Sequence, residues 1–143
     1  MGVSELNLDD DFAEALVVPD AARWALVRSN PLEVVATIHP EQSPEERFEA
    51  RLLWDRYPED PPSLKFRDRA TARLDVTSAW PKVRGFRPGS LDTCVNWTVE
   101  GFKLHSEWAN DPKLRWDRRG NVLLKVLRTL IDEMDNYFEG RHP

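Results

Sequence analysis

An amphipathic segment near the C-terminus constrains the fold of this chain more than any other feature. Between positions 121 and 138, apolar residues recur at intervals of three and four, which is the spacing of one face of an α-helix. They are Leu123, Val126, Leu127, Leu130, Ile131, Met134 and Phe138. Asn121 is a natural N-cap. A helix with one apolar face must bury that face, so we expect it to lie on a sheet formed by the preceding strands.

Short alternating apolar runs upstream predict that sheet. Residues 23–29 and 32–38 are interpreted as two strands joined by a tight Ser-Asn-Pro turn, and residues 47–54 alternate as a third strand should. Residues 63–66 supply a short fourth strand, and residues 70–76 either extend it or begin another. The pattern predicts an α+β fold with a four-stranded antiparallel meander and flanking helices.

The rest of the chain is organised around this sheet, and its 143 residues suit a single domain. We expect a short N-terminal helix within residues 1–22 and the meander within residues 23–76. Residues 77–119 show little periodicity, and the C-terminal helix occupies residues 120–143. Loops carry sites more often than core elements do, so the functional site is expected in the 77–119 region.

Composition argues against several classes of function. The chain has 20 Lys and Arg against 25 Asp and Glu, so its net charge of −5 gives no general attraction to nucleic acid or anionic lipid. No secretory signal and no apolar run long enough to span a bilayer is visible, so we expect a cytoplasmic protein. Dinucleotide, phosphate-loop and hydrolase motifs are absent from the sequence. The single cysteine, Cys94, excludes a CxxC pair and an internal disulfide, and neither a metal nor an organic cofactor is expected.

A proline-rich connection separates the third and fourth predicted strands. It occupies residues 57–62 and opens the motif "YPEDPPSLKF", which runs on into the fourth predicted strand. Pro58, Pro61 and Pro62 each fix φ and remove a backbone donor, so the connection should be rigid and outside the sheet. We call it the proline bracket, and we expect the Tyr57 ring to pack beneath the loop.

The order of the motifs resembles that of the ubiquitin-conjugating enzyme (UBC-like) family. After the proline bracket come "GSLDTC" at residues 89–94 and Trp116 leading into "NVLLKVLRTLI" at residues 121–131. The resemblance covers roughly residues 23–138, and between the motifs it is one of order rather than of letters. It implies a UBC-like fold. It also implies that one cysteine accepts a ubiquitin-like protein from an activating enzyme as a thioester and passes it to a target protein.

Cys94 stands where the catalytic cysteine of that family would. The reaction needs an accessible and partly ionised thiol, because the thiolate is the nucleophile and a free thiol titrates at about 8.5. Arg84 and Arg87 lie a few positions upstream and would favour the anion. The alternative is an inert core cysteine, a common location for this residue type. The implied partners are the ubiquitin-like protein, the activating enzyme and the target, and ATP is used by the activating enzyme.

The chain departs from the family pattern before Cys94. The family's His-Pro-Asn triplet, whose asparagine stabilises the oxyanion, is missing. The candidate positions are "WPK" at residues 80–82 and "RPG" at residues 87–89, and each keeps only the proline. Asn96 and His105 are therefore the candidate catalytic helpers. Asn96 would share a face with Cys94 if a strand continued there, and a histidine with a pKa near about 6.5 suits proton transfer. The plainer alternatives are a loop asparagine and a solvated histidine.

The chain also departs from the pattern after Cys94. The distance along the chain from Cys94 to Trp116 exceeds the family norm, and an inserted hairpin is expected within residues 95–108. Such departures suggest a divergent, bacterial-type member of a ubiquitination-like pathway.

Two other functions remain open. Domains that resemble this family but lack a working cysteine, such as RWD-like modules, act as protein-docking platforms. The missing triplet favours that function, whereas Cys94 opposes it. The segment "WANDPKLRWDRR" at residues 108–119 mixes Trp with basic residues, as single-strand nucleic-acid sites do, but the negative net charge argues against such a site.

Overall fold

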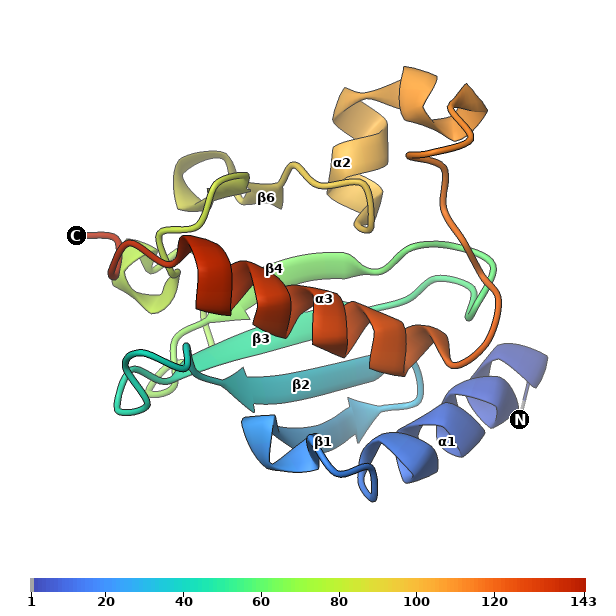
Figure 1. Ribbon diagram of the computed structural model, residues 1–143, viewed down its shortest axis with the longest axis horizontal. Helices are drawn as coiled ribbons and strands as arrows, with labels where there is room; N and C mark the ends of the chain where they lie inside the picture. The colour runs from blue at the N-terminus through green and yellow to red at the C-terminus, as the bar shows by residue number, and fades with distance from the viewer. Residues whose placement is uncertain (1) are drawn as a thin grey trace.

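A four-stranded antiparallel sheet lies at the centre of the computed structural model, which describes residues 2–143 (Figure 1). The sheet order follows the chain, so neighbouring strands are joined directly as a meander. The strands are β1 (Trp24–Asn30), β2 (Glu33–Ile38), β3 (Phe48–Leu53) and β4 (Ser63–Arg67). The predicted α+β class with a four-stranded antiparallel sheet and flanking helices is confirmed.

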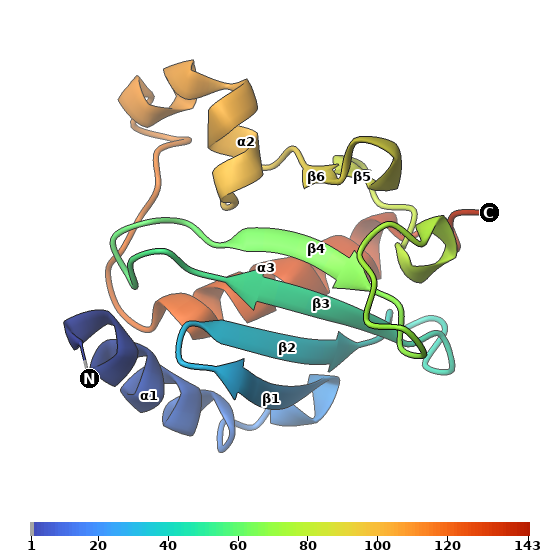
Figure 2. The same ribbon diagram turned by 180° about the vertical axis from the view of Figure 1, so that it is seen from behind.

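Two helices flank this sheet. α1 (Val3–Ala15) precedes β1, and α3 (Val122–Tyr137) crosses one face of the sheet (Figures 1 and 2). The Asn121 side chain accepts a hydrogen bond from the Leu124 N–H at 2.9 Å, so Asn121 caps α3 as predicted. The α3 residues that the periodicity selects for the sheet side are buried.

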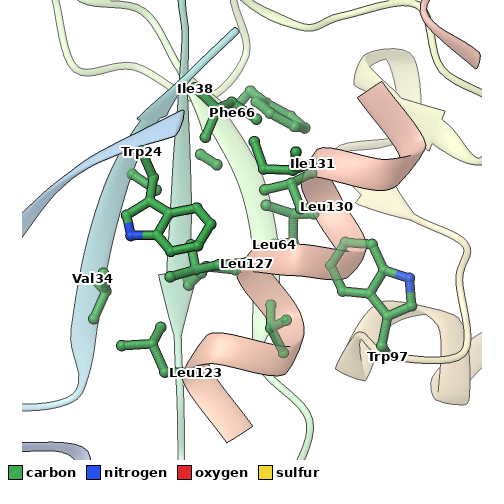
Figure 3. Packing of buried hydrophobic residues seen from close by; sticks show 14 of the residues in the cluster. Trp24, Val34, Ile38, Leu64, Phe66, Trp97, Leu123, Leu127, Leu130 and Ile131 are labelled. Carbon is green, nitrogen blue, oxygen red and sulfur yellow. The ribbon is translucent and has the colours of Figure 1, made fainter. Parts of the chain in front are cut away.

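The core lies between α3 and the inner face of the sheet. Leu127 is fully buried there and points toward Trp24 and the strands (Figure 3). Burying one such leucine contributes about 1.5–3 kcal/mol. The fully buried strand residues at this interface include Val34, Ala36, Ile38, Leu52, Leu64 and Phe66. The fold is therefore built on the apolar helix face that the sequence marks most clearly.

The outer face of the sheet is more polar. Glu49 on β3 accepts hydrogen bonds from Arg67 at 2.6 Å and lies 3.2 Å from the Arg69 guanidinium. Arg51 lies directly opposite Lys65 in the register of β3 and β4. Charged side chains thus lie on the β3–β4 part of the face opposite α3, as is common for antiparallel sheets packed on one side only.

Two expectations for the connecting segments are wrong. Residues 70–76 hold no strand, because the chain turns directly after β4: the Asp68 N–H donates to the Arg73 carbonyl and the Ala72 N–H donates to the Asp68 carbonyl. Residues 95–108 hold no hairpin, because the Thr98 side chain caps a short helix, α2 (Val99–Leu104), by accepting from the Gly101 N–H at 3.1 Å.

The remaining elements of the 77–119 region are short. A short hairpin pairs two strands of two residues each, β5 (Phe86–Arg87) and β6 (Asp92–Thr93). This hairpin lies before Cys94 rather than after it. A 3-10 helix at Ser106–Asn110 follows α2. Figure 1 shows α2 and this turn standing away from the sheet. Among residues 2–143, no helix has the length and apolar character needed to cross a bilayer.

Candidate functional site

Cys94 lies directly after β6, on a loop tied to the edge of the sheet. Its N–H donates to the Gly85 carbonyl at 2.7 Å, and the buried Thr93 hydroxyl donates to the Leu64 carbonyl of β4 at 3.2 Å. Gly85 has φ +92°, and a Cβ there would lie 3.0 Å from the Cys94 carbonyl oxygen. Glycine therefore lets the two backbone segments approach closely enough to hold the cysteine.

The chain after Cys94 is held by α2. The Thr98 hydroxyl donates to the Thr93 carbonyl at 2.7 Å while it caps the helix, so one side chain closes the loop from both ends. Gly101 packs directly on this loop, and a Cβ there would lie 1.9 Å from the Val95 carbonyl oxygen. Cys94 therefore sits on a short backbone segment held by hydrogen bonds and by close backbone contact.

The Cys94 side chain borders a small cavity. It is half-buried, lies outside the main hydrophobic cluster and lines a space of about 220 Å³. We call this space the thiol cavity. The other lining side chains that bear on its chemistry are Arg84, Asn96, Trp97, Trp108 and Glu133. The thiol is thus neither enclosed by the core nor placed on an open surface.

Two charged residues that are distant in the sequence, Arg84 and Glu133, line the thiol cavity. Glu133 comes from α3, and burial raises the pKa of its carboxyl, although Arg84 opposes that shift. The Arg84 guanidinium lies 5.7 Å from the centre of the Tyr137 ring, which helps to position it. The cavity therefore combines a thiol, an acid and a cation in a partly dehydrated space.

Arg87, the other arginine expected to assist the thiol, has a different partner. It binds Asp92 at 2.6 Å across the β5–β6 turn and does not line the thiol cavity. The pKa of Arg87 is raised mainly by its hydrogen bond to Asp92, with a smaller contribution from the charge of Cys94. Arg84 is therefore the arginine placed to act on a molecule in the cavity.

Asn96 lines the thiol cavity, but not for the reason expected from the sequence. β6 ends at Thr93, and the Val95 N–H donates a hydrogen bond to the Thr93 carbonyl at 3.1 Å. The chain therefore turns here, and no strand places Cys94 and Asn96 on one face. The Asn96 Nδ2 donates to the Leu114 carbonyl at 3.4 Å. A turn, fixed by that contact, brings the amide to the cavity.

His105 lies farther from the thiol. It does not line the cavity, and its ring stacks on Trp108 with centroids 4.4 Å apart. Its Nδ1 lies 3.1 Å from a carboxylate oxygen of Glu107, and 41% of the side chain is exposed. The structure thus places Asn96 in the lining of the same cavity as Cys94, whereas His105 lies outside that lining.

The proline bracket is hydrogen-bonded to the segment that follows the Cys94 loop. Its Pro58 carbonyl accepts from the Trp116 indole N–H at 3.0 Å, and its Pro62 carbonyl accepts from the Val99 N–H at 2.8 Å. Both ends of the segment that forms α2 and the following turn are therefore attached to the bracket. "WPK" at residues 80–82 has no such role at the cavity, since Trp80 is buried against Phe66 with ring centroids 5.4 Å apart.

Tyr57 joins the bracket to both flanking helices. Its ring is buried, its hydroxyl donates to the Asp11 carboxylate of α1, and the same oxygen accepts from the Leu123 N–H of α3 at 2.8 Å. Burial raises the pKa of Tyr57, as does its bond to Asp11, so the phenol stays protonated and can donate. Tyr57 is therefore a structural joint between the bracket, α1 and α3.

Glu133 is the site residue that sequence reasoning missed. It lies on the polar face of α3 with other acidic residues, and nothing in the local sequence distinguishes it from them. Only the packing of α3 beside residues 84–85 selects it. Among residues 2–143, no three His, Cys, Asp or Glu side chains gather as a metal site would require. Comparisons with family models, curated proteins and solved structures gave no match to this chain.

Proposed function

We propose that this protein is a UBC-like carrier that holds a ubiquitin-like protein as a thioester on Cys94 and passes it to a target. The observation that carries this proposal is the half-buried Cys94 thiol, which lines a small cavity together with Asn96 and Arg84. The UBC-like assignment is supported by the order of the elements: a helix, a four-stranded meander with the proline bracket between its third and fourth strands, the cysteine and a helix over the sheet.

The proposed reaction has two acyl transfers. In the first, the Cys94 sulfur attacks the thioester that joins the modifier to its activating enzyme. The new carbon–sulfur bond forms at Cys94, the old one breaks, and the enzyme's sulfur leaves with the proton that Cys94 lost. In the second, an amine of the target attacks the same carbonyl, and the Cys94 sulfur leaves with the proton released by the amine. No metal or redox partner is required by either step.

The thiol cavity contains groups suited to these steps. A carbonyl under attack becomes negatively charged at oxygen, and donors already in place stabilise that charge. The Asn96 amide has a second N–H besides the one bonded to Leu114, and Arg84 supplies a cation. A volume of about 220 Å³ fits the last residues of a chain but not a folded protein.

Incubation with the cognate activating enzyme, its modifier and ATP tests the proposal. We expect an adduct that a reducing thiol removes, and we expect none in Cys94→Ala. Cys94→Ser should instead form an ester that resists the reducing thiol, because an oxygen ester exchanges with thiols far more slowly than a thioester does. An unmodified Cys94 in the presence of all these components would favour the non-catalytic docking module.

A further inference from the structure

A second cavity adjoins the thiol cavity along α3. It has a volume of about 310 Å³, and it shares Asn96 and Trp97 with the thiol cavity. Its far end is lined by Lys113, Arg115 and Lys125. We call the two cavities together the α3 groove. Figure 3 shows Trp97 beside α3, apart from the side chains that lie between the helix and the sheet.

One row of α3 side chains forms a wall of the groove. Lys125, Thr129 and Glu133 are spaced four residues apart, so they lie on one face of the helix. Lys125 and Glu133 are eight steps apart along the helix, a distance of about 12 Å. An extended peptide covers that distance with about four residues. If the last residue of an extended peptide reaches Cys94, the residues before it would therefore lie beside the far end of the groove.

The charges differ between the two ends of the groove. Glu133 and Arg84 share the end at Cys94. At the far end, Asp117 is paired with Arg119 at 2.9 Å and lies 3.6 Å from Lys125, and these contacts hold its pKa below the ordinary range. Among the residues that the structure describes, Lys113 and Arg115 form no ion pair.

The cations that line the far end, Lys113, Arg115 and Lys125, outnumber its single carboxylate, Asp117, although the whole chain has a net charge of −5. An anionic ligand would complete their pairing and be attracted to them at a distance. A nucleic acid fits less well, because Trp97 is only 8% exposed and its ring is not free to stack on bases, and because the net charge of the chain is negative.

We propose that the α3 groove binds an extended acidic C-terminal tail of the modifier. The terminal carboxyl lies at Cys94, and acidic side chains two to five residues before it lie beside Lys113 and Arg115. This inference rests on the proposed function, because it assigns the tail to the protein carried by Cys94. It adds a selection rule: the groove favours modifiers with acidic tails over those with neutral or basic ones.

Fluorescence polarisation with short labelled peptides tests the inference without any upstream enzyme. The probe is fluorescein-labelled Glu-Glu-Glu-Glu-Gly-Gly with a free carboxyl terminus, and the matched probe replaces each Glu with Gln. Binding is measured to Cys94→Ala protein, so that no covalent adduct contributes. We expect the acidic probe to bind more tightly than the neutral one, with a preference that shrinks as salt is added.

Charge-reversal variants then locate the binding. Lys113→Glu combined with Arg115→Glu should weaken the acidic probe by about tenfold. Lys65→Glu combined with Lys82→Glu makes the same change of charge at two residues that do not line the groove, and it should leave binding unchanged. The inference is overturned if both peptides bind equally, if the double variant binds normally, or if single-stranded DNA of the same length binds more tightly through the same residues.

The two proposals can fail separately. If Cys94 becomes acylated while the acidic peptide does not bind, only the selection rule is lost. If the acidic peptide binds and Cys94 is never acylated, the thioester function is lost and the groove remains a peptide-binding site.

Discussion

The sheet with α3 and the segment that carries Cys94 are held in place by different kinds of interaction. α3 is fixed by a continuous apolar face, in which Leu123, Leu127 and Leu130 are fully buried against the strands. The Cys94 loop has few buried apolar side chains and is fixed by backbone hydrogen bonds from Cys94 and Thr98 and by close contact at Gly101.

This difference separates stability from chemistry. The stabilisation from burying apolar area is non-directional and roughly proportional to the area buried, so it suits a scaffold. Hydrogen bonds and glycine contacts specify where a few atoms lie, as a reactive group requires. We therefore expect substitutions in the first region to change mainly the free energy of unfolding, and substitutions in the second to change mainly the behaviour of the thiol.

The largest effect is expected at the centre of the core. Leu127→Ala removes a fully buried side chain between α3 and the sheet, and it should lower the free energy of unfolding by about 2–5 kcal/mol. Urea denaturation measures this. Leu104→Ala is the matched control, because Leu104 is 51% exposed and its loss should have little effect. Equal effects for the two variants would contradict the packing of α3 on the sheet.

The proline bracket connects the two regions, and Tyr57 is its joint to the helices. Tyr57→Phe removes the hydroxyl that bonds Asp11 and Leu123 and leaves the Leu123 N–H buried without that acceptor. We expect a loss of about 2 kcal/mol in unfolding free energy. Tyr137→Phe, at an exposed tyrosine, should change it little. A Tyr57→Phe protein as stable as the original would show that the hydroxyl contributes nothing to the joint.

A substitution in the second region should act on the thiol. Gly101→Ala forces a methyl group toward the Val95 carbonyl, so α2 or the Cys94 loop must move. We expect a stability loss of about 1 kcal/mol and a several-fold change in the rate at which iodoacetamide alkylates Cys94. Gly89→Ala is the control, since nothing lies within 4 Å of the added methyl. The proposed loop geometry fails if the two variants react at the same rate.

The smallest effect is expected from the acid in the thiol cavity. Because burial raises the pKa of Glu133, the folded state binds its proton more tightly than the unfolded state does. Stability should therefore fall as pH rises from the ordinary carboxyl range through the raised pKa. Glu133→Gln should flatten this part of a plot of melting temperature against pH, whereas Glu139→Gln, at an exposed carboxylate, should not. If the melting temperature of Glu133→Gln depends on pH as that of the original protein does, the Glu133 carboxyl is not buried as described.

The same contrast explains what could be predicted from the sequence. α3 and the four strands follow hydrophobic periodicity, and the structure has them close to the periodic segments. The helix expected over residues 120–143 is shorter than that, because α3 ends at Tyr137 and residues 138–143 are not helical. α2 was missed because it has only six residues with a glycine among them, and its start depends on the Thr98 cap. The strand expected at residues 70–76 was wrong because the turn at Asp68 outweighs local alternation.

The site was only partly predictable for a related reason. Cys94 and Asn96 were selected by residue type and by nearness in the sequence, and both line the thiol cavity. His105 was selected in the same way, but it stacks on Trp108 and does not line the cavity. Glu133 and the far end of the α3 groove come from contacts between segments distant in the sequence, which no local pattern encodes.

The central claim is that the folded chain presents the Cys94 sulfur so that it can carry an acyl group. Transfer from a synthetic peptide α-thioester tests it most directly, because no upstream enzyme is needed. The Cys94 sulfur attacks the thioester carbonyl and releases a small thiol, and intact-mass spectrometry detects the added peptide. We predict one adduct on the folded protein, removed by dithiothreitol and absent in Cys94→Ala. An adduct that forms only after the chain is unfolded in urea would contradict the account.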